Sequence, residues 1–227
     1  MSNAEATTAD AVQTGSSTAW SLKFNRWDVL LAVGFAIALG ISSIELTTIT
    51  GLPAHPLLLH MPVIFVPLLV IAAITFAFKS QWRRRYGIAY GIGALITMAG
   101  TGIAVSAGEA LKESGDRLGN VFRAGGTALA SVGPDGESPL SQHAELGGVT
   151  RVVVFALVVA ILAQIAIDRG VVPAIARRFG HAKMPLALAL SVLTVALAGA
   201  SGWFVFATGH AGAKLTFGDV SPTIARR

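Results

Sequence analysis

Long apolar runs dominate this sequence, and a run of about 20 apolar residues is long enough to cross a bilayer as a helix. Such runs cover residues 28–47, 56–78, 87–108, 149–167 and 184–208. Only 13% of the residues are charged, against about 25% in an average soluble domain. Because lipid offers the backbone no hydrogen-bond partner, spans of this kind are helical. The sequence therefore predicts an all-α integral membrane fold, a five-helix transmembrane bundle.

The basic residues lie in short segments beside the apolar runs, as they do in the cytoplasmic loops of membrane proteins. The two most basic segments are residues 79–86 and 168–183, and Lys23 and Arg26 precede the first run. We therefore expect a cytoplasmic N-terminus and an extracytoplasmic C-terminus. This pattern also accounts for the net charge of +5, so nucleic acid is not an expected partner.

The composition changes along the chain in a way that predicts its domain organisation. Residues 1–19 are rich in Ala, Ser and Thr and predict a disordered cytoplasmic tail. Residues 20–215 form one transmembrane helical domain, which begins with a short interfacial helix at residues 20–27. The polar segment 109–148 is expected to be an outer loop, helical as far as Ser114, and residues 216–227 an extracytoplasmic tail.

The segment 51–62 contains two histidines, His55 and His60, and three prolines, and it opens an apolar run. Pro56 has no N–H to donate and suits the first helical position, which places His55 at or just before the cap. His60 then lies about one turn inside the helix. An imidazole so close to lipid needs a partner, because an unpaired polar group is costly there.

The remaining histidines extend this pattern. His143 precedes the fourth apolar run and His210 follows the fifth, so both are expected on the outer side with His55 and His60, whereas His181 is expected on the cytoplasmic side. Glu45 and Glu109 fall at the same outer ends. The chain has no cysteine, which excludes thiolate metal sites and c-type haem attachment, so any metal must be bound through nitrogen or oxygen. Neutral imidazole is the commonest nitrogen ligand of transition metals.

The opening segment His55 to Pro62, the later His143 and the closing segment Gly209 to Gly212 resemble a family of bacterial integral membrane proteins known only as a transmembrane domain of unknown function. The resemblance covers roughly residues 50–215. It implies a four-span family core, to which this chain adds an N-terminal span, and a place in the bacterial inner membrane with a periplasmic C-terminus. Some family members are fused to Rieske iron–sulfur domains, which implies by analogy a cytochrome, Rieske or quinone redox partner. Leu59, Met61, Ala211 and Ala213 depart from the family's usual motif residues.

The first functional hypothesis is membrane electron transfer by a b-type haem. Two axial imidazoles, small residues beside the porphyrin and cations near its propionates are required. His60 and His210 are the expected axial pair, because each lies on an apolar span, and the glycines of residues 87–108 provide room. His55 and His143 are expected to form a second site or to orient the first. Arg151, Lys214 and Arg123 are the candidate partners of the propionates.

Two other functions remain open. The same four histidines, with Glu45 or Glu109, are candidate ligands of a nonhaem zinc, copper or iron site for metal handling or hydrolysis. Alternatively, the protein is a structural or assembly subunit of a larger membrane complex, in which His55 caps a helix and His60 bonds a carbonyl. Walker, dinucleotide-binding and nucleophile-elbow motifs are absent, so an electron-transfer or complex subunit is favoured over a stand-alone enzyme.

Overall fold

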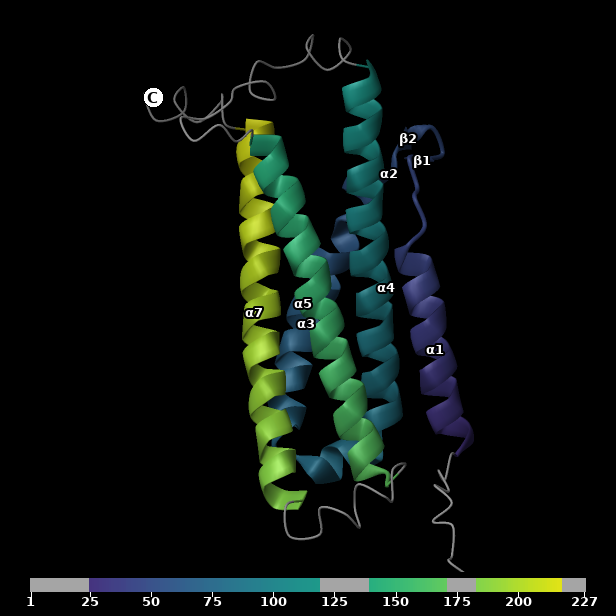
Figure 1. The fold of residues 1–227 in the computed structure, drawn as a ribbon, viewed down its shortest axis with the longest axis vertical. Helices are drawn as coiled ribbons and strands as arrows, with labels where there is room; N and C mark the ends of the chain where they lie inside the picture. Colours follow the sequence, from purple (N-terminus) through teal and green to yellow (C-terminus); the bar gives the residue numbers. More distant parts are fainter. Residues whose placement is uncertain (1–24, 119–138, 171–182, 218–227) are drawn as a thin grey trace, which may run out of the picture.

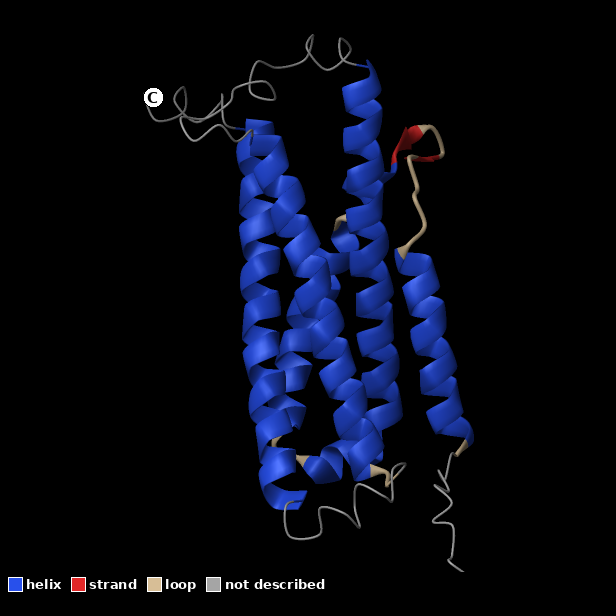
Figure 2. Cartoon of the chain, in the orientation of Figure 1, coloured by secondary structure: helices blue, strands red, loops and turns tan. Residues whose placement is uncertain are grey.

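The computed structural model describes residues 25–118, 139–170 and 183–217, and the description of the fold is confined to them. The helices are α1 (Arg26–Ser42), α2 (Ala54–Leu58), α3 (His60–Ala77), α4 (Ser80–Leu118), α5 (Pro139–Asp168) and α7 (Lys183–Phe217). A two-stranded antiparallel hairpin joins β1 (Thr48–Ile49) to β2 (Leu52–Pro53), with Ile49 opposite Leu52. The all-helical fold class is confirmed (Figure 2).

The four long helices α3, α4, α5 and α7 stand side by side, and α1 lies beside α4 at the margin of the bundle (Figure 1). Each of α3 and α5 packs against both α4 and α7, so the four helices form a closed ring, and α1 contacts α4. The ends of α3 and α5 that carry histidines lie at one end of the bundle, here called the histidine end. Segment 79–86 lies at the opposite end, here called the basic end.

Four segments are long and apolar enough to cross a membrane: 54–77, 80–113, 140–168 and 186–214. The expected first span, 28–47, is shorter than predicted, because α1 ends at Ser42 after 17 residues. The start of α1 follows the expected chemistry: Asn25 and Asp28 form a capping box, in which the Asp28 carboxylate accepts from the Asn25 N–H at 3.0 Å. Arg26 and Trp27 belong to α1 and Asn25 is its N-cap, whereas residues 20–24 of the expected interfacial helix lie outside the described residues.

The chain leaves α1 through a tight hairpin that the sequence analysis did not predict. Thr50 and Gly51 have φ values of 50° and 81°, and positive φ at both central residues is the requirement of a type I′ hairpin turn. Helix α2 follows directly and begins at Ala54, so His55 lies inside the helix instead of at its cap. Pro56 is tolerated there because the N–H groups of the first helical turn need no helical partner.

The other expected boundaries fall short of the observed helices. Helix α4 continues through the basic cluster at one end and past Ser114 at the other. Helix α5 begins ten residues before the expected span, so the prediction that His143 lies in a loop is wrong. The prediction that the last span stops at Gly209 to Gly212 is also wrong, because α7 continues to Phe217. Polar residues at the ends of a span extend its helix beyond lipid, and apolar length alone does not reveal this extension.

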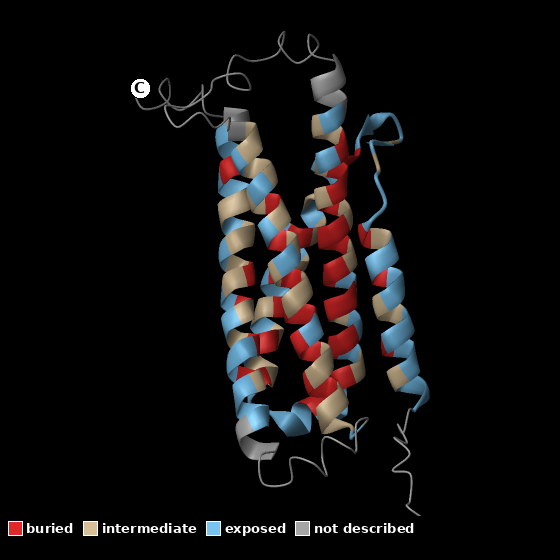
Figure 3. Ribbon diagram, viewed as in Figure 1, coloured by how far each residue is buried: buried red, intermediate tan, exposed pale blue. Residues whose placement is uncertain are grey.

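Buried residues line the inside of the bundle and exposed ones its outside (Figure 3). The interior contains hydroxyl side chains beside the apolar core, and many large apolar side chains are exposed. Thr194 and Ser201 are fully buried, whereas Val152, Trp203 and Phe206 are each 65% exposed. Several buried hydroxyls donate to the carbonyl one turn back, as Ser201 does to Leu197 at 2.8 Å. A surface of this kind is stable in lipid, where polar groups must be satisfied inside the protein.

The histidine pair at one end of the bundle

His55 lies on α2 and its ring packs against α4. Its Nδ1 is 2.8 Å from the carbonyl oxygen of Ala104. A carbonyl oxygen only accepts, so Nδ1 carries the proton and donates, which leaves the lone pair of Nε2 unused by this bond. The ring also lies on Gly108, where a Cβ would be 2.8 Å from the ring. His55 is half-buried and held on two sides.

His143 lies on α5 and its ring packs against α7 in the same manner. Its Nδ1 donates to the carbonyl oxygen of Thr208 at 3.0 Å, again leaving Nε2 with its lone pair. A Cβ at Gly212 would be 3.0 Å from the ring. A hydrogen bond of 2.9 Å between the hydroxyls of Thr150 and Thr208 ties the same two helices together.

The two rings meet edge to face between the helices. Their centroids are 6.1 Å apart and their planes are inclined by 81°. His55 and His143 therefore bring two imidazoles from separate helices to one place, each oriented by a backbone carbonyl. This arrangement is typical of metal-ligating histidines, whose second ring nitrogen is fixed by an outer partner.

The other two predicted ligands lie elsewhere. His60 is exposed, and its Nδ1 donates to the carbonyl of Leu57 in the preceding turn at 3.1 Å. His210 is exposed and stacks on Phe206 of its own helix, with centroids 6.2 Å apart. Within the described residues, neither histidine makes a ring contact with the His55–His143 pair.

The structure also describes most of the charged residues that were predicted to surround the histidines. Arg151 on α5 forms a two-pronged ion pair with Glu109 on α4, with both nitrogen–oxygen distances 3.3 Å. Glu45 and Lys214 are exposed. Arg123 and His181 lie outside the described residues. In the described part of the chain no group of three or more His, Asp or Glu side chains has the geometry to hold a metal ion.

The basic end contains a buried polar cluster that the sequence analysis missed. Arg83 is only 5% exposed, and it donates to Asp168 of α5 and to the carbonyls of Phe76 and Ala77 at the end of α3. The Ser191 hydroxyl of α7 donates to the same Ala77 carbonyl at 2.6 Å. Arg83 was interpreted only as a determinant of topology. The one signal in the sequence for this pairing was position. Arg83 lies at the start of one span and Asp168 at the end of the next, so both are expected at the same end of the bundle.

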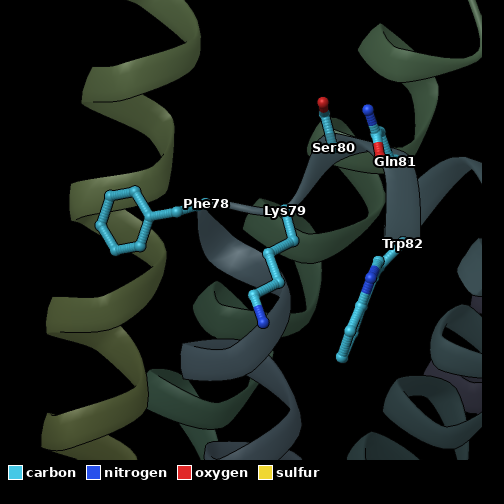
Figure 4. A pocket seen from close by; sticks show the side chains of 5 residues that line it. All are labelled: Phe78, Lys79, Ser80, Gln81 and Trp82. Atoms are coloured by element: carbon cyan, nitrogen blue, oxygen red, sulfur yellow. The ribbon is translucent and has the colours of Figure 1, made fainter.

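A surface hollow of about 330 Å³ also lies at the basic end, at the turn between α3 and α4. Its lining residues are Phe78, Lys79, Ser80, Gln81 and Trp82 (Figure 4). The Lys79 ammonium lies over the Trp82 ring, 4.1 Å from its centre. The hollow is at the opposite end of the bundle from His55 and His143, so it is not part of the histidine site.

A closed ring of long helices with an apolar exterior defines a multi-pass helical membrane protein. Residues 51–219 match the family described as "Predicted membrane protein (DUF2231)", and the chain belongs to this family. The match begins at the hairpin turn and includes both histidines of the pair, whereas α1 lies outside it. No curated protein and no solved structure matches the chain.

Proposed function

We propose that this protein is a membrane electron-transfer protein that binds a b-type haem through His55 and His143. The observation that carries the proposal is the meeting of two imidazoles, each with Nδ1 bonded to a carbonyl and each with an Nε2 lone pair to offer. The proposed axial pair therefore replaces His60 and His210, whose exposed rings make local contacts.

The separation of the two ring centroids, 6.1 Å, is close to the distance of about 6 Å that two imidazoles sharing one metal ion would have. A shared iron would require the rings to turn out of their edge-to-face contact until both Nε2 atoms face it. The glycines under both rings let α4 and α7 pack directly against the imidazoles.

The number of protein ligands favours haem over a nonhaem ion. A zinc site needs three or four protein ligands, and the described residues hold no such group. Haem brings four nitrogens of its own and needs only two axial ligands. When bound, it supplies an iron centre that accepts and releases one electron. His55 and His143 would hold the iron, while Arg151 is a candidate counter-ion for a propionate, in competition with Glu109.

The distribution of charge supports one orientation of the bundle in the membrane. The basic end carries Lys79, Arg84 and Arg85, so we place it in the cytoplasm and the histidine end at the periplasmic face of the inner membrane. A periplasmic cytochrome or Rieske protein, or a quinone in the bilayer, is then the proposed redox partner.

The test is an absorption spectrum of the detergent-purified protein, oxidised and then reduced with dithionite. We expect a Soret band and sharp reduced α and β bands, lost in His55→Ala and in His143→Ala. His60→Ala and His210→Ala are matched controls that retain the bands. If His60→Ala and His210→Ala lose the bands instead, the axial pair is the one first predicted from the sequence.

Two other outcomes separate the remaining functions. If the protein is colourless and contains stoichiometric copper, zinc or iron by elemental analysis, the histidine pair binds a nonhaem ion instead of haem. A colourless, metal-free protein that copurifies with other membrane subunits overturns the cofactor proposal and favours a structural role.

A further inference from the structure

The two histidines are held by the same device on two different helices. His55 bonds the carbonyl of residue 104 and lies on the glycine four positions later, at 108. His143 bonds the carbonyl of residue 208 and lies on the glycine four positions later, at 212. Residues four apart share one helical face, so each histidine contacts a carbonyl and a glycine on the same face of the helix it packs against.

We propose that the bundle consists of two structurally equivalent hairpins, α2–α3–α4 and α5–α7, and that Gly108 and Gly212 are equivalent positioning residues, one for each histidine. The inference deepens the proposed function, and it rests on that function for the identity of the ligand. It assigns the site one histidine, one carbonyl and one glycine from each half of the chain.

Burial along the first helix of each hairpin supports the equivalence. The offset that takes His55 to His143 is 88 residues, and it is fixed without reference to burial. Applied to the five buried residues of α3, it gives five positions of α5 that are all buried. The pairs are Pro62 and Thr150, Val66 and Val154, Leu69 and Leu157, Ala73 and Ile161, and Ala77 and Ile165.

The second helices give the same result with their own offset. The shift of 104 residues that takes Gly108 to Gly212 also relates every buried residue of α7 to a buried residue of α4. The pairs are Gly87 and Ser191, Tyr90 and Thr194, Ala94 and Ala198, Thr97 and Ser201, and Ala107 and Ala211. Thr97 and Ser201 even make the same bond, each donating to the carbonyl one turn back at 2.8 Å.

The arrangement of the helices agrees with this pairing. If the two hairpins are exchanged, α3 takes the place of α5 and α4 takes the place of α7. The α3–α4 contact then corresponds to the α5–α7 contact, and the α4–α5 contact corresponds to the α7–α3 contact. All four contacts exist. Parallel repeats of this kind are related by an axis along the membrane normal. Because His55 and His143 exchange with each other, the axis passes between their rings, where an ion bound by both would lie.

The departures from equivalence have a physical cause. Helix α4 buries further residues, including Met98, because α1 packs against it and has no counterpart beside α7. Helix α5 also buries Val158 and Gln164, whose counterparts in α3 are only half-buried. Only one copy has the break at Leu59, between α2 and α3. Apolar residues that face lipid are interchangeable, so the equivalence is visible in the burial pattern and in the histidine contacts and not in residue identity.

The glycines are testable because alanine is otherwise favourable in a helix. A Cβ at Gly108 or Gly212 would meet a histidine ring at 2.8 or 3.0 Å, so the ring must shift. Gly93 on α4 and Gly199 on α7 have nothing within 4 Å of an added Cβ and are matched controls on the same two helices. Alanine at the control positions gains about 1 kcal/mol of helix propensity and leaves the histidines in place.

The first measurement needs no cofactor. In the full-length protein with ¹⁵N-labelled histidine in detergent, we expect Gly108→Ala to shift the Nδ1–H resonance of His55 and Gly212→Ala to shift that of His143, while both controls leave them unchanged. Resonances that stay in place in both glycine variants, or a response in only one hairpin, overturn the equivalence. This result does not depend on whether haem binds.

The second measurement uses haem titration of the same variants. We expect Gly108→Ala and Gly212→Ala each to bind haem about tenfold more weakly, the loss typical of a disturbed outer partner of a ligand, and Gly93→Ala and Gly199→Ala to bind as the unsubstituted protein does. If the resonances shift as expected but haem binds to none of the proteins, the proposed function fails and the equivalence of the hairpins stands. Equal haem affinity in all four variants contradicts the positioning role.

Discussion

Arg83 on α4 and Asp168 at the end of α5 form a buried ion pair, in which Nε and Oδ2 are 2.5 Å apart and the side chains are 6% and 12% exposed. The same guanidinium donates to two carbonyls at the end of α3, including that of Phe76 at 2.5 Å. A single cation therefore joins three helices of the bundle at its basic end.

We predict that Asp168→Asn lowers the stability of the protein by about 3–5 kcal/mol, because the substitution leaves the buried Arg83 charge without its counter-ion. Thermal unfolding in detergent, followed by circular dichroism, measures the loss. Arg85→Met is the control, because the exposed Arg85 guanidinium lies over Tyr86 and has no buried anion to leave behind. If Asp168→Asn and Arg85→Met unfold at the same temperature, the ion pair contributes little to the stability of the protein.

The four segments able to span a membrane could be predicted from apolar length, which is a short-range property of the sequence. The pairing of Arg83 with Asp168 did not follow, because it depends on how α4 and α5 cross. Sequence alone gave no reason to separate Arg83 from its exposed neighbours Arg84 and Arg85. The phase of the helix decides which of the three faces the bundle.

The histidine site was predicted in part. All four outer histidines were candidates, and His55 and His143 are the two that meet. His60 and His210 were preferred because they lie closer to apolar sequence, but proximity to an apolar run does not say which face of the helix a residue occupies. His55 and His60 are five residues apart, which is about 140° around a helix axis, so His55 packs against α4 while His60 is exposed.

The close contact of α1 with α4 depends on a glycine of α4, Gly91. An added Cβ at Gly91 of α4 would lie 2.8 Å from the side chain of Leu31 on α1. We predict that Gly91→Leu displaces α1 from the bundle, because a branched side chain cannot fit in that space, while Gly93→Leu on an open face of the same helix does not.

Limited proteolysis measures the displacement of α1. The segment between Ser43 and Thr47 should be cleaved at least several times faster in Gly91→Leu than in Gly93→Leu. Equal cleavage rates in the two variants contradict the close approach of α1 to α4. The contact of His55 with His143 is expected to be intact in both variants, since α1 does not contribute either histidine of the pair.

The hairpin turn before α2 contains a strained residue. Thr50 has a φ of 50°, a conformation that is unfavourable for a β-branched side chain, and its hydroxyl bonds only the adjacent carbonyl of Ile49. We predict that Thr50→Gly stabilises the protein by up to about 1 kcal/mol, because glycine adopts positive φ without steric cost. Gly51→Ala, at a φ of 81°, is expected to destabilise it by a similar amount. Thermal unfolding of the two variants should give shifts of opposite sign, and shifts of the same sign contradict the turn geometry.

The orientation of the bundle is testable directly, because the chain has no cysteine of its own. Leu52→Cys places a thiol on the exposed hairpin near the histidine end, and Ser80→Cys places one at the exposed start of α4 at the basic end. In intact cells stripped of their outer membrane, a charged maleimide that cannot cross lipid should label Leu52→Cys at once and Ser80→Cys only after the inner membrane is permeabilised. The physical reason for this expectation is that the membrane potential and anionic lipid favour positive charge on the cytoplasmic side, and Lys79, Arg84 and Arg85 lie at that end of the bundle. The reverse labelling pattern places His55 and His143 at the cytoplasmic face and contradicts the proposed periplasmic redox partner.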